Sequence, residues 1–583
     1  MVQRARIVRS ALLLLLLGGA PAPDAARLSA EALKLLDPRG VVRALCEQPR
    51  PRELAMAGSA YAAPVFAAAA MPLIDGLGAP AFTPTTTSET ARRYFAQGVA
   101  LTSGFRFDEA VKSFRQARAA DPTCAMCAWG VAYALGPYVN NSVGAPAAIR
   151  EARAITAAAL RLDASPLERA LIEALHLRYA PGGTQGGVHA DGFADAMAGV
   201  ASRFPDSDFT LVLAAEAMMN TQPWDYWTAG GRAAKGRAPL AIALVEKVLA
   251  RAPDHPQATH LYVHLIEASA RPERAEAAAD RLRTLAPASA HLVHMPSHIY
   301  YRLGRYRDSV NTNLEAIAVD EGYSRRTGVA DGAGFYYRHH AHFVMSSAGQ
   351  MIDRATALRM ADGLAASLPV SFARDNGFAQ MRLAAVSQTR AMLLAPAEFA
   401  ALPLPAAELP FTRAFHHVLR AEAYGRLGDA AATRAELAAA RTLRDTPALA
   451  KLDLLGSRMS TLLGVGEQMA AGRLAMARGQ TVAAVTRFRA AVGLEAGVPY
   501  LEPPLFPQPA SLALGAALLK QGKAEDARAA FMRALIERPS SRWALTGLAE
   551  AQAALGDESG RRATLVALAD GAQPAWRATV DQL

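Results

Sequence analysis

The sequence has few cysteines and few long apolar runs. Its 583 residues include only three cysteines, Cys46, Cys124 and Cys127, too few to act as a disulfide scaffold for a chain of this length. Beyond the first 26 residues, no segment reaches the roughly 20 uninterrupted apolar residues that a membrane-spanning helix needs. We therefore expect no membrane crossing after the N-terminal segment.

Lysine is also scarce, although the chain is basic. The formal net charge is +10, and most of the 62 basic residues are arginines. Nucleic-acid-binding proteins gather such charge in patches, whereas these arginines are scattered along the chain among aspartate and glutamate residues. We interpret them as solvated helix faces and expect no nucleic-acid partner.

The N-terminus has the order of a secretory signal peptide. Arg4, Arg6 and Arg9 form a basic region, which the apolar run Ala11–Leu17 and the small-residue segment Ala20–Ala22 follow. The apolar run is too short to span a bilayer comfortably. We predict a signal peptide over residues 1–26 and a periplasmic or secreted protein, with an uncleaved N-terminal anchor as the alternative.

The chain does have an internal repeat of the tetratricopeptide (TPR) type. In this repeat, small residues let two antiparallel helices approach closely, a bulky residue fills the space between them, and a proline ends the second helix. Residues 91–124 carry these features at Gly98, Ala110, Phe114, Ala117 and Pro122. We therefore predict a TPR helix pair in this segment.

The same spacing recurs in residues 256–289, 290–323, 338–371, 414–447, 465–498 and 508–541. We predict an all-α fold, a TPR α-solenoid in which antiparallel helix pairs stack into a superhelix. The expected organisation is a signal peptide (1–26), a leader or cap (27–90), an N-terminal TPR block (91–395), a Pro-rich boundary (396–410) and a C-terminal TPR block (411–583). An insertion, Ser324–Tyr337, interrupts the first block, and its glycines suggest a lid.

Histidines are concentrated in the middle repeats, because nine of the thirteen lie between His255 and His342. Residues three or four apart share a helix face, and equal positions of stacked repeats lie side by side. The face expected to line the concave groove carries Gln257, His260, His264 and Glu267, then His291, His294, His298 and Tyr301, then His339, His342, Ser346 and Gly349. The pattern therefore predicts a lattice of neighbouring imidazoles.

We predict a transition-metal site within this lattice, since imidazole favours Zn, Cu or Fe over Mg or Ca. The candidate ligands are His260, His264, Glu267, His291, His294, His298 and His342. Pro296 is expected to bend a helix at the lattice. Two alternatives remain open: the histidines contact a bound peptide, or they form ordinary structural hydrogen bonds.

Two weaker signals lie outside the lattice. Cys124 and Cys127 form a C-x-x-C pair without the following histidine of a haem attachment motif, so a local disulfide and an inert pair are both open. Trp224, Tyr226 and Trp227 precede the histidine repeats and either wall the groove or pack in the core.

Several motifs resemble a family of uncharacterised bacterial TPR proteins over about residues 91–555. They are Asp121–Gly130 (DPTCAMCAWG), Ala252–His255, His291–Tyr300 (HLVHMPSHIY) with Gly304–Tyr306, and Glu502–Pro504 (EPP) followed by the repeat at Gly515. The resemblance implies helical repeats with inward-facing histidines at His260, His264, His291, His294, His298 and His342. The chain departs from the family pattern at Tyr337–His340, so no role for His340 is carried over.

These observations support three functional hypotheses. The first is an exported TPR scaffold that binds a transition metal in its groove. The second is a metal-free module that holds a protein or peptide partner in the same groove. The third is a metalloenzyme with an open coordination position on the ion, for which the sequence assigns no catalytic residue.

Overall fold

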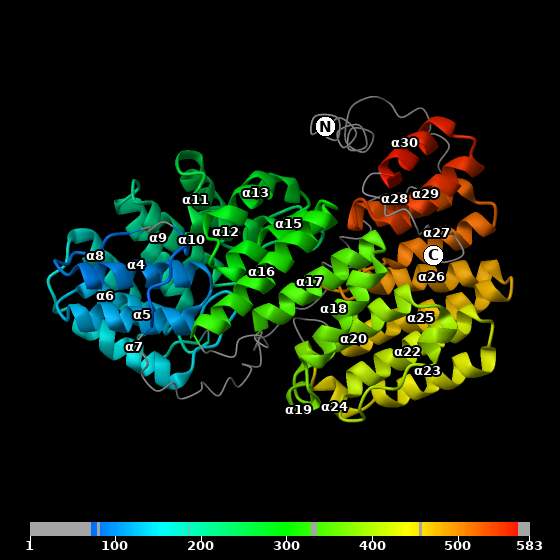
Figure 1. The fold of residues 1–583 in the computed structure, drawn as a ribbon, viewed down its shortest axis with the longest axis horizontal. Coiled ribbons are helices and arrows are strands. Elements are labelled where there is room, and N and C mark those ends of the chain that lie inside the picture. Colours follow the sequence, from blue (N-terminus) through cyan, green and yellow to red (C-terminus); the bar gives the residue numbers. More distant parts are fainter. Residues whose placement is uncertain (1–70, 79–81, 185, 328–334, 454–457, 570–583) are drawn as a thin grey trace. The chain divides into compact units, whose positions relative to one another are not determined.

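The computed structural model describes residues 71–78, 82–184, 186–327, 335–453 and 458–569 (Figure 1). These residues are all-α and contain no β-strand beyond two isolated bridges, Tyr138–Asn141 and Trp227–Ala234. The predicted all-α TPR α-solenoid is confirmed. The predicted signal peptide and most of the predicted leader, residues 27–70, lie outside the described residues.

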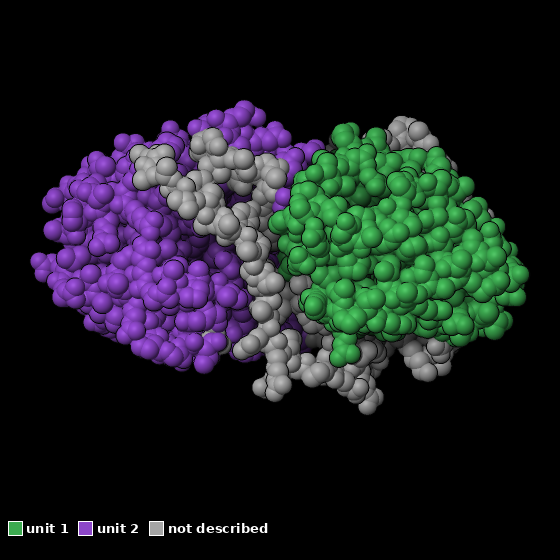
Figure 2. Space-filling model, turned by 90° about the horizontal axis from the view of Figure 1, so that it is seen from below, with its two compact units in different colours: residues 1–48, 302–307, 345–583 green, residues 49–301, 308–344 purple. Residues whose placement is uncertain are grey.

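The chain forms two compact units (Figure 2). Unit 2 comprises residues 49–301 and 308–344, and unit 1 comprises residues 1–48, 302–307 and 345–583. The Pro-rich segment 396–410 lies inside unit 1, where Pro396–Ala400 forms the short helix α21. The structural division therefore falls within helix α17 (Phe335–Met351).

Unit 2 is built from helices that pack against their neighbours in chain order. They are α4 (Glu89–Ser103), α5 (Phe107–Ala120), α6 (Ala125–Ala134), α7 (Pro146–Ala159), α8 (Pro166–Arg178), α9 (Ala190–Arg203), α10 (Asp208–Met219), α11 (Ala238–Arg251), α12 (Pro256–Ile266), α13 (Glu276–Leu285), α14 (Ala290–His294), α15 (Pro296–Arg302) and α16 (Tyr306–Thr327). Short 3-10 helices, Ala229–Gly231 and Pro272–Ala275, join some of them.

Unit 1 repeats the same plan after α17. Its helices are α18 (Arg354–Ala366), α19 (Val370–Ala373), α20 (Gly377–Leu393), α21, α22 (Pro410–Arg426), α23 (Ala430–Arg444), α24 (Pro447–Ala450), α25 (Met459–Ala477), α26 (Thr481–Glu495), α27 (Ala510–Lys520), α28 (Ala524–Glu537), α29 (Arg542–Ala554) and α30 (Glu558–Ala569). None of the helices in the described part of the chain is both long and apolar enough to cross a membrane.

In the structure, the repeat spacing places glycines of neighbouring helices against a phenylalanine ring. Phe114 of α5 is fully buried, and a Cβ added to Gly98 of α4 or Gly130 of α6 would lie within 2.5 Å of its ring. Phe531 lies in the same way between Gly515 and Gly547. The missing side chains let three consecutive helices close around one aromatic ring, which is the packing that the TPR pattern predicts.

Two features interrupt the regular pairs near the histidines. The first helix of repeat 290–323 ends at His294 and restarts at Pro296, as the missing proline N–H predicts. The predicted insertion is partly helical, because α16 extends to Thr327 and α17 begins at Phe335. Its glycines Gly328, Gly332 and Gly334, on which the expected lid depends, lie outside the described residues.

Candidate metal centre

Unit 2 brings six histidines together as two neighbouring triads. The first triad consists of His260 and His264, one turn apart on α12, and His291 of α14. The second consists of His294, His298 and His339, from the last residue of α14, from α15 and from α17. Within each triad, one potential ligand atom from each residue lies within 4.8 Å of the others.

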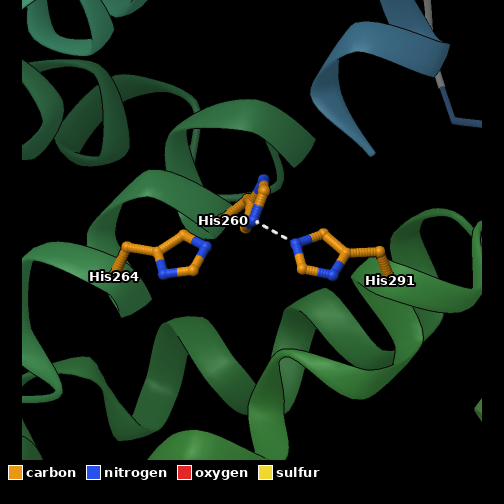
Figure 3. A group of neighbouring side chains, drawn as sticks. All are labelled: His260, His264 and His291. Carbon is orange, nitrogen blue, oxygen red and sulfur yellow. Dashed lines mark hydrogen bonds between the residues drawn. The ribbon is translucent and has the colours of Figure 1, made fainter. Parts of the chain in front are cut away.

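In the first triad, the three rings turn toward one another (Figure 3). The Nε2 atoms of His260 and His291 are 3.1 Å apart. On its other side, His260 donates its Nδ1–H to the carbonyl oxygen of Ser103, at 2.7 Å. A carbonyl only accepts, so the proton of neutral His260 is on Nδ1 and the lone pair on Nε2 faces His291.

In the second triad, the Nε2 atoms of His294 and His298 are 2.8 Å apart. The Nδ1–H of His294 donates to Oδ1 of Asn313, at 2.5 Å, and the amide nitrogen of Asn313 donates to the carbonyl of Ser309. This second bond fixes the orientation of the amide, so Asn313 presents an acceptor to His294.

Glu267 connects the two triads. Its Oε1 atom accepts from Nδ1 of His264 at 3.2 Å, and its Oε2 atom accepts from Nδ1 of His298 at 2.6 Å. The carboxylate and both rings are at least 98% buried. Each carboxylate oxygen therefore holds the proton of one ring on Nδ1. The lone pair on Nε2 of that ring then faces the other histidines of the same triad.

These hydrogen bonds create an electrostatic conflict at the second triad. Neutral His294 and His298 both carry the proton on Nδ1, so two Nε2 lone pairs face each other at 2.8 Å with no hydrogen between them. In the first triad, Nε2 of His264 is buried and makes no hydrogen bond. A cation between such nitrogens would remove the repulsion and satisfy the lone pairs.

At four of the six rings, a proton is a poor candidate for that cation. Burial lowers the pKa of His260 to about 3, although the Ser103 carbonyl opposes the shift. Burial also holds the pKa of His264, His291 and His294 well below the usual histidine range, and repulsion from neighbouring imidazoles adds to the effect. His260, His264, His291 and His294 are therefore neutral at physiological pH, which is the state that binds metal.

Aromatic side chains surround the triads. The ring of Phe105, in the turn after α4, lies 4.5–5.6 Å from the rings of His260, His264 and His291, measured between centroids. Trp224 meets the His264 ring edge-on at 4.9 Å, and Phe343 contacts His294 and His298. The cluster thus lies in an apolar interior and not on the open face of a groove.

The predicted lattice is only partly the one observed. The structure brings five of the candidate ligands together in the two triads: His260, His264, His291, His294 and His298. In α17, His339 joins the second triad, while His342 belongs to neither triad. Glu267 contacts Nδ1 atoms and so supports the rings from behind.

Sequence reasoning missed several residues of the site. Ser103 and Phe105 come from a repeat far from the histidines in the chain, and no local signal marks them. His340 was set aside, yet its ring lies 4.5 Å from that of His294, and its Nδ1 lies 3.2 Å from Asp320. Asn313 occupies an otherwise ordinary helix, and only its position opposite His294 shows its role.

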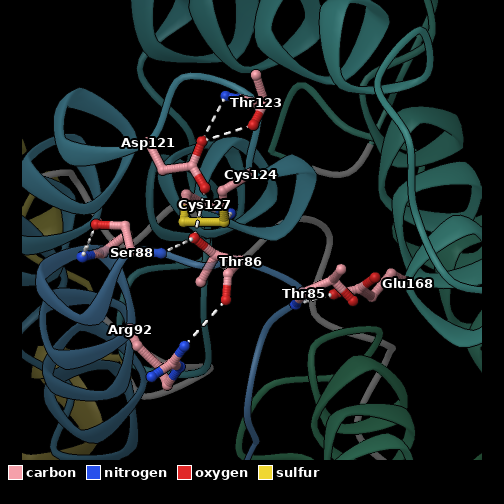
Figure 4. Close-up of a disulfide and its surroundings, with 10 residues drawn as sticks. Thr85, Thr86, Ser88, Arg92, Asp121, Thr123, Cys124, Cys127 and Glu168 are labelled. Atoms are coloured by element: carbon pink, nitrogen blue, oxygen red, sulfur yellow. Dashed lines mark hydrogen bonds between the residues drawn. A yellow bond between two sulfur atoms is a disulfide. The ribbon is translucent and has the colours of Figure 1, made fainter.

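The structure also distinguishes between the two alternatives for the C-x-x-C pair, a local disulfide and an inert pair. Cys124 and Cys127 form a disulfide at the start of α6, where Cys124 is the N-cap residue (Figure 4). Both cysteines are buried, and the nearby Asp121 side chain accepts hydrogen bonds from Thr123 and Thr86. The bridge therefore lies within the first turn of α6.

No family model matches this sequence, and no curated protein matches it either. Solved TPR-type solenoids align with most of the chain at low similarity. Yeast Tom70 has 12% identity and a TM-score of 0.29, covering 81% of this chain and 97% of its own. The human IFIT1 dimer with m7Gppp-AAAA has 11% identity and a TM-score of 0.30, covering 84% and 92%. The Cut9–Hcn1 hetero-tetramer of APC/C has 13% identity and a TM-score of 0.27, covering 83% of this chain and 78% of its own. Since these scores are low, the fold assignment rests on the packing of this chain's own repeats.

Proposed function

We propose that this protein is an exported TPR scaffold that holds a transition metal in its histidine triads. The observation that carries the proposal is the pair of Nε2 atoms of His294 and His298, 2.8 Å apart, with both Nδ1 atoms committed to acceptors. Orienting hydrogen bonds of this kind, from a carboxylate or amide behind each imidazole, are typical of metal-ligating histidines.

The spacing of the nitrogens fits a metal ion after a small adjustment. A tetrahedral ion with Zn–N bonds of about 2.1 Å holds neighbouring ligand nitrogens about 3.4 Å apart. The observed separations, 2.8 Å in one triad and 3.1 Å in the other, need to open by about 0.6 Å and about 0.3 Å to match this spacing. Three neutral imidazoles suit Zn or Cu, and Fe is the third candidate.

Burial favours a resident metal over a peptide contact. Five of the six triad histidines are at most 3% exposed, so a peptide on the surface could not reach their nitrogens. A protein or peptide partner would instead bind elsewhere on the solenoid, and we keep that partner as part of the proposed scaffold role. The shared motifs support placing the protein among the bacterial TPR proteins that it resembles.

The metalloenzyme hypothesis is weaker in this structure. Three protein ligands leave a fourth position open, as in catalytic zinc sites, but a substrate also needs access to the ion. The aromatic side chains around the triads, with Phe105 stacked on the first one, restrict that access. We therefore propose binding of the metal as the function, without a catalytic step.

Elemental analysis of the protein purified from its natural compartment tests the proposal. We expect Zn, Cu or Fe at one or more equivalents per chain. Replacing His294 with alanine should lower the content strongly, and Asn313→Ala should weaken metal affinity by about 10- to 100-fold, because an orienting bond is lost.

His417→Ala is the matched control. His417 is also buried and also pairs its Nδ1 with a carboxylate, that of Glu436 at 2.6 Å, but it belongs to no histidine triad among the described residues. Its replacement should leave the metal content unchanged. Metal-free wild-type protein that also fails to take up added Zn²⁺ or Cu²⁺ would overturn the proposal.

A further inference from the structure

We propose that the histidine array is a two-metal centre, in which each triad binds its own ion and Glu267 orients one ligand of each. This inference rests on the proposed metal-binding function and extends it to stoichiometry and coupling. It differs from the single shared site that the sequence pattern suggests.

The triads use different nitrogens and different supports. His260, His264 and His291 form one group, and His294, His298 and His339 form the other, with no residue in common. His260 is supported by the Ser103 carbonyl, while His294 is supported by the Asn313 amide. Each triad can therefore supply three imidazoles to its own ion and leave one position open.

The triads are also immediate neighbours. The rings of His291 and His294, which belong to different triads, have centroids 6.0 Å apart, and the rings of His264 and His298 have centroids 6.1 Å apart. A single tetrahedral ion has room for four ligands, so it cannot use all six imidazoles. Two ions use every ring without sharing one.

Glu267 is a carboxylate that the structure places against Nδ1 atoms of both triads. Its negative charge lies against one ring of each triad, so it would stabilise a dication in either one. It would compensate only part of the charge of two such ions, and the second ion should therefore bind more weakly than the first.

The chemistry of the carboxylate explains why an amide cannot replace it. Both carboxylate oxygens accept, so Glu267 can receive an Nδ1–H from His264 and another from His298. In Glu267→Gln, one of these rings faces an NH₂ group and must accept on Nδ1. Its proton then moves to Nε2, where it blocks the ligand atom.

Titration of the metal-free, full-length protein with Co²⁺, followed by its d–d absorption, tests the inference. We expect two equivalents to bind in two steps, with the second step weaker. His260→Ala should remove one equivalent and His294→Ala the other, each leaving a single step. His417→Ala should retain both.

Glu267→Gln should weaken at least one step by about tenfold or more, while Glu436→Gln, which changes the matched carboxylate beside His417, should change neither. The melting temperature of each metal-free variant separates positioning from stability, because a purely structural role would lower it and leave the Co²⁺ affinities unchanged. Unchanged affinities in Glu267→Gln would overturn the shared role of the carboxylate.

The stoichiometry of the wild-type protein needs no variant and decides the main point. One equivalent of Co²⁺, lost in both His260→Ala and His294→Ala, would overturn the two-metal centre and leave the proposed metal-binding function standing. No binding of Co²⁺ or Zn²⁺ at all would overturn both.

Discussion

At the scale of single residues, four of the triad histidines stay neutral while they are buried: His260, His264, His291 and His294. His260 illustrates the balance, because burial lowers its pKa to about 3 although a backbone carbonyl accepts its Nδ1–H. A buried imidazolium would have to leave this environment or find an anion. The folded protein therefore excludes protons from the same nitrogens that a metal would use.

This neutrality predicts that the metal-free protein loses stability in mild acid. The pKa of His264 is lowered in the folded state, so below pH ~6.5 the unfolded chain binds a proton that the folded chain does not. The free energy of unfolding should fall as the pH drops from 6.5 toward 5, with each such histidine contributing about 1.4 kcal/mol per pH unit.

Chemical denaturation at several pH values measures this slope. His264→Gln removes one titrating ring and should reduce the slope by about 1.4 kcal/mol per pH unit. An identical slope in wild-type protein and His264→Gln would contradict the lowered pKa.

At the scale of helices, neighbouring helices pack closely because a phenylalanine ring on one helix lies against a glycine on the next. Phe114 fills the space that Gly98 and Gly130 leave, and Phe488 packs against Gly472 in the same way. The packed helix pairs also bring together residues that lie far apart in the sequence. The C-terminal end of α4 places the Ser103 carbonyl against His260 of α12, so the packing of a regular repeat also supports the site.

We expect Gly98→Ala to destabilise unit 2 by about 1–3 kcal/mol, because its new Cβ would lie 2.5 Å from the buried ring of Phe114. Gly199→Ala is the matched control in helix α9, where a new Cβ meets no atom within 4 Å. That change should be neutral or stabilise by about 0.5–1 kcal/mol, since alanine favours the helix. Calorimetric melting compares the two variants, and equal effects would contradict the packing role.

At the scale of the whole molecule, export and the disulfide are consistent with each other. Structural disulfides persist in oxidising compartments, and Cys124 and Cys127 form one at the start of α6. The basic, apolar and small-residue order of the first 26 residues is the independent reason to propose export. The proposed periplasmic or secreted location would also define where the metal is acquired.

The export proposal predicts a cleaved N-terminus. Mature protein isolated from its natural compartment should begin between Pro21 and Leu28, because cleavage follows the small-residue segment. Edman sequencing or intact mass measures the start. Native material that begins at Met1 or Val2 would contradict cleavage and favour the anchor.

The sequence alone determined the repeat fold and the first approximation of the site. Small and bulky residues at fixed spacing specify helix pairs through local contacts, and histidines one turn apart, such as His260 and His264, share a face in any α-helix. Pro296 likewise breaks its helix for a purely local reason. These features depend on periodicity, which a single sequence displays directly.

Only the tertiary structure decided how the histidines are grouped. Helix α17 begins at Phe335, and its packing turns His339 with Phe343 toward the second triad, so His342 lies in neither. The carbonyl that accepts the Nδ1–H of His260 belongs to Ser103, 157 residues away. The Glu267 carboxylate accepts from one ring of each triad. Helix rotation and such distant partners are set by side-chain packing between elements, which sequence spacing does not encode.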